Sequence, residues 1–277
     1  MAALQTDMDS RELNFVPVDN ANPKTLTREQ IDFYNEFGYL KPFRIYDDAR
    51  TAANREYFDW MLETIQQMDD GRDAYSINGY ETRCAKLWDI VTDLKILDLV
   101  EDIVGPSFVC WGTHFFCKLP GDEKAVPWHQ DASYWPFDTS RTVTVWLAID
   151  DADAENAAMQ VIAGSHRQGH LEWKDTESLA VLNQEIVNVE RLGSPVYLDL
   201  KAGEISLHSD MLAHGSTPNR STRRRCGLTM RYCTTDVKAI NPNWARNVIL
   251  CRGDDPHGHW ENRPRPSGED LSPLRDD

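Results

Sequence analysis

The hydrophobic residues of the first third of the chain recur with helical spacing. A helix is predicted after Thr27, where Thr27-Arg28-Glu29-Gln30 fits a capping box, and it ends at Gly38. A longer helix is predicted from Asp47 to Met68, with one apolar stripe. A third, from Ile96 to Val104, is stopped by Gly105-Pro106. Helices therefore come first in the chain.

The pattern then changes to short β-rich stretches bounded by Gly, Pro or polar turns. Strands are predicted at Phe108–Lys118, Thr142–Ile149, Val196–Leu200, Ile205–His208 and Leu228–Thr234. Residues 75–86 are predicted to be a loop that enters the core, and residues 175–191 a polar excursion that is partly helical. Helices followed by many short strands indicate an α+β chain built on a β-sandwich or open barrel.

Length and periodicity indicate a single domain. Of the 277 residues, 25–265 are assigned to it. Residues 1–24 lack helical or strand periodicity, so we expect a flexible N-terminal arm, and residues 266–277 are expected to be a flexible tail. We find no internal repeat and no low-complexity segment.

Charge excludes two classes of partner. The net charge is −16, and the one basic run is Arg223-Arg224-Arg225. Binding to nucleic acid or to an anionic membrane as the main task needs a basic surface, which is missing. No Cys-x-x-Cys pair, signal peptide or apolar run of about 20 residues is found, so we expect a cytoplasmic, soluble protein with reduced cysteines.

Candidate chemistry begins at His129 and Asp131, which are two residues apart. In extended backbone such residues project to one side and can hold adjacent positions on a divalent metal. A rival pair is His208 and Asp210, whose third ligand would have to come from the tail. If His129 and Asp131 are the pair, His208 and His214 both lie far enough downstream to complete it.

The other histidines are weaker candidates for a ligand. His166 and His170 are too close along the chain to His129 to arrive from a separate strand, and His257 and His259 lie in the Pro/Gly-rich tail. His214 precedes Gly215-Ser216, and Arg225 follows eleven residues after it. A guanidinium there could bind a carboxylate through two hydrogen bonds, although in a run of three arginines it could equally be a solvated surface charge.

Together, the His-x-Asp pair, the distal His-Gly-Ser and the following Arg resemble the iron(II)/2-oxoglutarate oxygenases, and among them the phytanoyl-CoA dioxygenase family. The resemblance covers roughly residues 26–262. It is carried by Trp128-His129-Gln130-Asp131, Thr144 to Asp150, Ala163-Gly164-Ser165-His166, His214-Gly215-Ser216 with Asn219, Ser221 and Arg225, and the opening Leu26 to Leu40. Ala163, where the family usually has Pro, is a small departure.

The resemblance implies a double-stranded β-helix (jelly roll) with N-terminal helices packed on one sheet. His129, Asp131 and His214 would bind Fe(II), and 2-oxoglutarate and O2 would be the cosubstrates, with ascorbate stimulatory. Arg225 would bind the distal carboxylate of 2-oxoglutarate. Further contacts to the cosubstrate are expected from Lys86, His114, Gln130, Trp146 and Ser216, although Lys86 could be a surface cation and His114 and Trp146 ordinary core residues.

The resemblance also implies hydroxylation of a small molecule by a monomer or homodimer. Halogenating relatives lack the carboxylate of Asp131, so its presence favours oxygenation. Substrate contacts are expected from Tyr134, Trp135, Asn78 and Tyr80, and the three aromatic rings among them could surround an ammonium group or simply pack. The chain resembles the bacterial branch that acts on 2-aminoethylphosphonate-type compounds and ectoine, which suggests an aminoalkylphosphonate or amino-acid-like substrate. Desaturation, epimerisation or cyclisation at the same iron, and a non-catalytic cupin-like binding protein, are the alternatives.

Overall fold

Four helices precede most of the strands. The computed structural model describes residues 8, 11, 13–176 and 179–274. The α-helices with more than one described residue are α2 (Arg28–Phe37), α3 (Asp48–Gln67), α4 (Ala85–Val91) and α5 (Leu94–Val104). The Thr27–Gln30 capping box forms, and Gly38 ends α2 at φ 84°, a conformation that favours glycine. The three predicted helices are confirmed, whereas α4 was not predicted.

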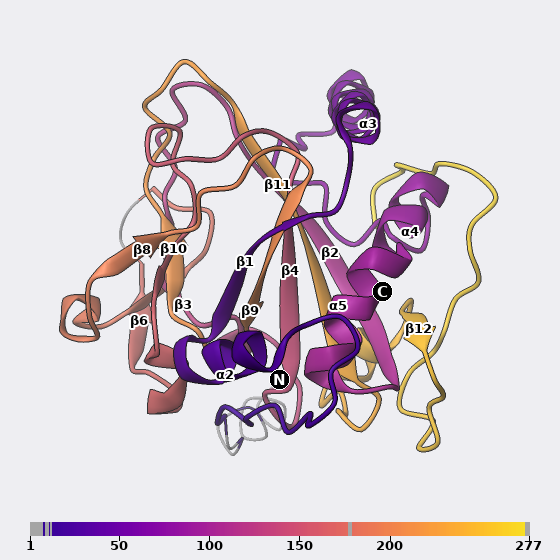
Figure 1. Ribbon diagram of the computed structural model, residues 1–277. Coiled ribbons are helices and arrows are strands. Elements are labelled where there is room, and N and C mark those ends of the chain that lie inside the picture. Colours follow the sequence, from indigo (N-terminus) through magenta and orange to yellow (C-terminus); the bar gives the residue numbers. More distant parts are fainter. Residues whose placement is uncertain (1–7, 9–10, 12, 177–178, 275–277) are drawn as a thin grey trace.

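The larger sheet contains six strands within the described residues, and every neighbouring pair is antiparallel. Figure 1 shows its strands side by side at the centre of the molecule. Their order is β1 (Tyr39–Arg44), β9 (Glu204–Ser209), β4 (Thr142–Ala148), β11 (Arg225–Thr234), β2 (Phe108–Lys118) and β12 (Ile249–Arg252). The predicted bounds of β2 are confirmed, while β11 begins three residues earlier than predicted.

A smaller sheet lies beside the larger one (Figure 1). Its order is β3 (Val126–His129), β10 (His214–Ser216), β5 (Gln160–Ile162) and β8 (Pro195–Tyr197), and a separate pair is formed by β6 (Trp173–Asp175) and β7 (Gln184–Ile186). Short 3-10 turns lie at Asp131–Ser133, Ser165–Gln168, Val189–Arg191 and Pro242–Ala245. The two antiparallel sheets form the predicted α+β double-stranded β-helix.

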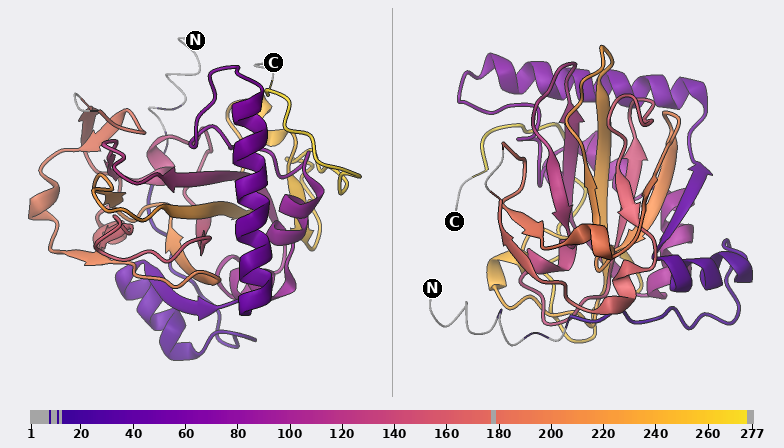
Figure 2. Two further views of the ribbon diagram at one scale, coloured as in Figure 1. Left: turned by 90° about the horizontal axis from the view of Figure 1, so that it is seen from above. Right: turned by 90° about the vertical axis from the view of Figure 1, so that its left-hand side faces the viewer.

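The two faces of the larger sheet differ in character because side chains alternate along a strand. On its outer face, apolar residues pack against α3, α4 and α5, and the Phe58 and Phe115 rings lie 4.9 Å apart. Both views in Figure 2 show α3 running across the strand direction. The inner face carries polar groups, among them His114, Thr229 and Trp146, which are register partners on three adjacent strands. The inner face therefore faces the site.

Three details differ from the prediction. The excursion at 175–191 is the β6–β7 hairpin and one 3-10 turn, with no α-helix among its described residues. Strand β1 follows α2 directly, and β12 lies in the Pro/Gly-rich region. Both pair at the edges of the larger sheet, where short strands carry little periodicity.

The segments before and after the predicted domain contact it. Leu13 is buried, and the Asp102 carboxylate accepts backbone hydrogen bonds from Lys24, Thr25 and Leu26. Near the other terminus, Leu271 is buried. The predicted arm and tail are thus in contact with the body from residue 13 and as far as residue 271. Residues 1–7 and 275–277 lie outside the described residues, and the flexibility expected of the N-terminal arm and the C-terminal tail remains a prediction.

Two expectations about the whole chain can be compared with the structure. All six cysteines are free, and all except Cys251 are buried. In the described part of the chain, no helix combines the length and the apolar character needed to cross a lipid bilayer.

Candidate active site

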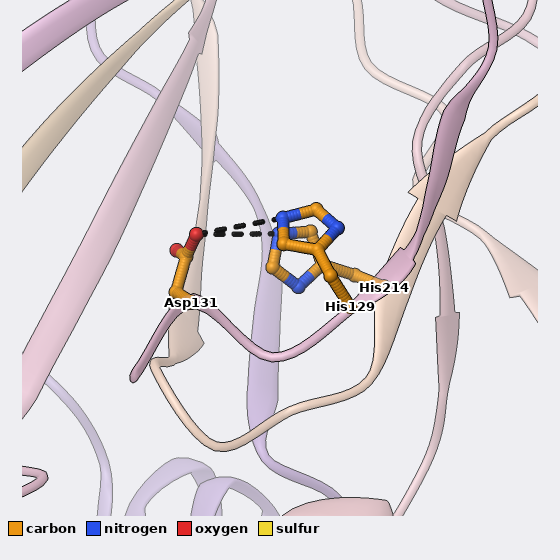
Figure 3. Close-up of side chains that lie close together, drawn as sticks. All are labelled: His129, Asp131 and His214. Carbon is orange, nitrogen blue, oxygen red and sulfur yellow. Dashed lines mark ion pairs between the residues drawn. The ribbon is translucent and has the colours of Figure 1, made fainter. Parts of the chain in front are cut away.

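Three side chains from two strands and a turn converge in the interior. His129 at the end of β3 and His214 at the start of β10 are register partners across the smaller sheet, and Asp131 begins the following 3-10 turn. Asp131 Oδ1 lies 3.5 Å from His129 Nε2 and 3.9 Å from His214 Nε2. Figure 3 shows both imidazoles turned toward the carboxylate. One ligand atom from each residue lies within 4.8 Å of the others.

Backbone carbonyls determine which imidazole nitrogen is free. His129 Nδ1 lies 2.8 Å from the carbonyl oxygen of Pro127, and His214 Nδ1 lies 2.9 Å from that of Leu212. Because a carbonyl oxygen only accepts, each Nδ1 carries a proton, and Nε2 is the ring nitrogen that faces Asp131. Burial lowers the pKa of His214 well below its ordinary value, so its imidazole is neutral.

The carboxylate is oriented from the larger sheet. Thr144 on β4 donates a hydrogen bond of 3.0 Å to Asp131 Oδ2, which leaves Oδ1 facing the two histidines. Two neutral imidazole nitrogens and one carboxylate oxygen are the donor set of non-haem Fe(II) oxygenases. The Nδ1–carbonyl and Thr144–Asp131 hydrogen bonds are the outer contacts that orient such ligands. The donors therefore fit a divalent iron.

The rival pair is separated because β9 ends at Ser209, so that Asp210 lies beyond the strand and does not share the direction of His208. His208 faces the triad, with Nε2 3.7 Å from Asp131 Oδ2 and its ring 4.7 Å from that of His214. Asp210 instead accepts the backbone N–H of Thr142, and burial raises the pKa of its carboxyl to about 8. Neither ring nitrogen of His208 has a hydrogen-bond partner among the described residues. His208 is thus a wall of the site rather than half of a second pair.

Arg225, at the start of β11, is a buried cation. Its side chain donates to the carbonyl of Ala157 at 3.1 Å and to the hydroxyl of Ser216 at 3.1 Å, and its guanidinium lies 5.8 Å from the Trp146 ring centroid. No carboxylate among the described residues pairs with it, although only 2% of the residue is exposed. An unpaired buried charge is costly, so this position is suited to an anionic group.

Its neighbours in the basic run behave differently. Arg224 pairs with Asp150 and Asp59, and Arg223 with Asp153 and Glu155. The surface-charge interpretation of the run is therefore right for Arg223 and wrong for Arg225.

One cavity joins the three ligands to the guanidinium. Its lining residues are Phe116, Val126, His129, Asp131, Trp146, Met159, His208, His214, Gly215, Ser216, Arg225, Thr229 and Arg231. The predicted residues Trp146 and Ser216 are thus brought together with Arg225 and the triad.

Lys118, the register partner of Arg225 on β2, was missed from the sequence as a site residue. It is fully buried, and its Nζ donates to the carbonyls of Lys124 at 2.6 Å and Thr217 at 2.9 Å. Burial and the nearby Arg225 lower the pKa of its ammonium to about 7. The sequence did offer one signal: Lys118 lies four residues after His114 on β2, so both side chains are on the same face of the strand.

Three predicted cosubstrate contacts lie outside the cavity lining. Lys86 is exposed on α4, with its Nζ 5.4 Å from the Tyr57 ring centroid, so the structure does not bring it to Arg225. His114 Nε2 lies 2.7 Å from the Tyr75 carbonyl oxygen, and burial lowers the pKa of His114 to about 4. The Gln130 amide donates to the carbonyls of Gly169 and Met211 and holds loops together.

The four residues predicted to contact the substrate lie in different surroundings. The Tyr134 ring lies 5.8 Å from that of His129. Trp135 is buried in an aromatic cluster, 4.6 Å from Trp111. Asn78 pairs with His114 in an isolated bridge, and the Tyr80 hydroxyl accepts a hydrogen bond from Arg72 at 2.7 Å, near residues 271 and 272. Tyr134 is near the triad, whereas Tyr80 is a packing residue away from it.

Comparison with known proteins identifies the family. The family model described as phytanoyl-CoA dioxygenase (PhyH) matches residues 34–227, a stretch that contains all three triad residues and Arg225. The chain belongs to the phytanoyl-CoA dioxygenase family.

The relatives and solved structures that resemble this chain differ widely from it in sequence. The peroxisomal phytanoyl-CoA dioxygenase of Bos taurus is 23% identical over 243 residues, which are 78% of this chain and 71% of that protein. The apo form of the non-heme monooxygenase ThoJ superposes with a TM-score of 0.74 at 24% identity, covering 86% of this chain and 88% of ThoJ. EctD from S. alaskensis with 2-oxoglutarate and 5-hydroxyectoine gives a TM-score of 0.68 at 17% identity, covering 82% and 83%. At these identities the structures establish the shared fold.

As a member of the phytanoyl-CoA dioxygenase family, the protein is an Fe(II)/2-oxoglutarate-dependent dioxygenase, with O2 as the second cosubstrate. The predicted family, fold class, enzyme class and cofactors are confirmed.

Proposed function

We propose that this dioxygenase hydroxylates an aliphatic C–H bond of a small polar metabolite and converts 2-oxoglutarate to succinate and CO2. The observation that carries the proposal is that one cavity contains both the triad and Arg225, which has no carboxylate partner among the described residues. The likeness to EctD with bound 5-hydroxyectoine supports a small substrate.

We assign the iron ligands to His129 Nε2, Asp131 Oδ1 and His214 Nε2. Bound iron would supply the activation of O2. The chain prepares these ligands in advance, since backbone carbonyls orient both imidazoles through Nδ1 and Thr144 orients the carboxylate.

Arg225 is assigned to the distal carboxylate of 2-oxoglutarate. Its guanidinium already donates to Ser216, so the two residues together present donors to an anion. The Trp146 ring covers the guanidinium and excludes water, which strengthens an ionic hydrogen bond there. Lys118 adds positive charge behind Arg225 without lining the cavity.

The metal assignment is tested by the weak visible charge-transfer band that Fe(II) and 2-oxoglutarate form without oxygen. We expect the band in the wild type, its loss in Asp131→Ala and His214→Ala, and its retention in His208→Ala. His208 is a matched control because it lies in the same cavity and contacts the same carboxylate. A band that survives His214→Ala and is lost in His208→Ala would show that the ligand set is wrong.

The cosubstrate assignment is tested with Arg225→Gln. Removing one partner of a buried charged hydrogen bond costs about 2–5 kcal/mol, so the 2-oxoglutarate concentration for half-saturation should rise by roughly 30-fold or more with iron still bound. Arg223→Gln is the control, because it removes the same charge from a residue paired at the surface. Unchanged 2-oxoglutarate affinity in Arg225→Gln would remove Arg225 from the site. A screen for succinate formation with amino acids and short phosphonates would then identify the substrate.

A further inference from the structure

A second arginine of β11 lines the active-site cavity and has no assigned partner. Arg231 lies six residues after Arg225, and strand alternation places both on the inner face. Its register partner is Thr144, the residue that holds Asp131. Arg231 is therefore close to the iron site but separate from the position assigned to 2-oxoglutarate.

The half-buried Arg231 forms no hydrogen bond and no ion pair with any residue that the structure describes, and its Nε, which is shielded from solvent, is without an acceptor. Arg223 and Arg224 on the same segment each pair with two carboxylates. A guanidinium stays protonated in proteins and has five donors, so at Arg231 the Nε–H is unsatisfied and the other donors are free to bind a group that enters the cavity.

Two tryptophan rings lie within cation–π distance of this guanidinium. Its central carbon lies 5.4 Å from the Trp111 ring centroid and 5.5 Å from that of Trp135. A cation–π contact does not replace the hydrogen-bond acceptors that the N–H groups of a guanidinium need. Trp111 Nε1 is a second buried donor without a partner in the described residues. Arg231 and Trp111 thus both present N–H donors here that lack hydrogen-bond acceptors.

The surrounding charges point the same way. Asp131 and Glu81 are the carboxyl groups that favour the charged form of Arg231, but neither is within ion-pair distance among the described contacts. Glu81 is bound to the Thr113 hydroxyl at 2.6 Å, and burial raises the pKa of its carboxyl. A divalent ion on Asp131 would offset that carboxylate's charge, so the iron-loaded enzyme leaves Arg231 still less compensated.

We propose that Arg231 binds an oxyanion group of the substrate, a carboxylate or a phosphonate, inside the active-site cavity. This inference rests on the proposed function and names the substrate class: a small organic acid whose reacting carbon is held near the iron by its anionic end. It also changes the expectation for Trp135. The ring that could have received a substrate ammonium is in contact with a cation of the chain itself, so the substrate's anionic end is the group recognised there.

The test uses the anaerobic Fe(II)/2-oxoglutarate enzyme and methylphosphonate as the probe. High-spin iron speeds the phosphorus-31 relaxation of a phosphonate that is held nearby. With 2-oxoglutarate saturating, we expect a saturable enhancement in the wild type. It should fall at least tenfold in Arg231→Gln, fall less in Arg231→Lys, and be unchanged in the surface control Arg223→Gln. Circular dichroism confirms that the variants are folded.

The charge-transfer band, recorded on the same samples, separates the two proposals. If the wild type forms no band, the proposed function fails, whatever the relaxation data. If the band forms but methylphosphonate is not relaxed, or is relaxed equally in Arg231→Gln, the substrate-anion site is refuted. A tenfold loss of 2-oxoglutarate affinity in Arg231→Gln would assign the residue to the cosubstrate and also overturn the inference.

Discussion

Gly227 and Trp146 should be strongly coupled, because the indole occupies the space that a side chain at 227 would need. A Cβ on Gly227 would lie 1.9 Å from Cζ2 and 2.2 Å from Cε2 of Trp146. Trp146 is only 3% exposed and covers Arg225, so its ring can move only by disturbing the cavity. Gly227→Ala should therefore damage both stability and cosubstrate binding.

The magnitudes follow from packing. Inserting a methyl group into a filled core costs about 1–3 kcal/mol of unfolding free energy. Trp146→Phe removes the clashing ring atoms and leaves a void, with a cost of about 1–2 kcal/mol, less than the complete truncation of an aromatic residue. In that background the new methyl enters the void. Gly227→Ala should then change stability by less than about 0.5 kcal/mol or increase it, since Gly within a strand is less stable than Ala.

The assay is urea unfolding of the four apo proteins, with 2-oxoglutarate affinity measured on the same samples. A coupling free energy of about 1–3 kcal/mol is expected from the cycle. Gly112→Ala on neighbouring β2 is the control, because its Cβ would meet nothing closer than 3.8 Å, and it should shift stability by less than about 0.5 kcal/mol. Additive effects of Gly227→Ala and Trp146→Phe would refute the packing argument.

Two further predictions concern groups behind the cavity wall. Thr144→Val removes the hydrogen bond that orients Asp131, so iron affinity in an anaerobic titration should fall about 10–100-fold, and an equal affinity would contradict that role. The pKa of Lys118 is about 7, and a bound dicarboxylate beside Arg225 should raise it. Binding then takes up a proton above pH 7 and weakens as pH rises; calorimetry in two buffers should detect the uptake, and Lys118→Met should abolish it. In the free enzyme the sign for stability is opposite, because the unfolded chain binds more protons between pH 7 and 10.5, so this group's contribution to stability increases with pH in that window.

The sequence was most informative where spacing itself carries the chemistry. The spacing of His129 and Asp131 named two candidate ligands, but His208 and His214 stayed open as the third until the family resemblance favoured His214, and the structure brings His129, Asp131 and His214 together. Strand β2 and helix α2 were likewise predictable, because long periodic segments with clear boundaries leave few alternatives.

Arg231 and Lys118 could not be found in this way. Each is an ordinary basic residue within a strand, and its position inside the cavity depends on which strands pair and in which register. Lys86 shows the opposite case, a residue that the sequence singled out but that the structure does not bring to Arg225. Its place along the chain matched a family position, but α4 begins at Ala85 and turns its ammonium toward Tyr57 on α3. The edge strands β1 and β12 are too short to leave a pattern.

The iron ligands and the arginine assigned to 2-oxoglutarate come from different sheets, and this arrangement affects which cosubstrate can bind. His129 and His214 belong to the smaller sheet, whereas Arg225 belongs to the larger one. On the proposed assignment, one molecule of 2-oxoglutarate spans the gap between the layers, so the separation of the sheets sets the carbon-chain length that can reach both. Because a close-packed interior adjusts little, oxaloacetate should be too short and 2-oxoadipate too long. Substitutions in the core between the layers could then alter this preference without touching the cosubstrate.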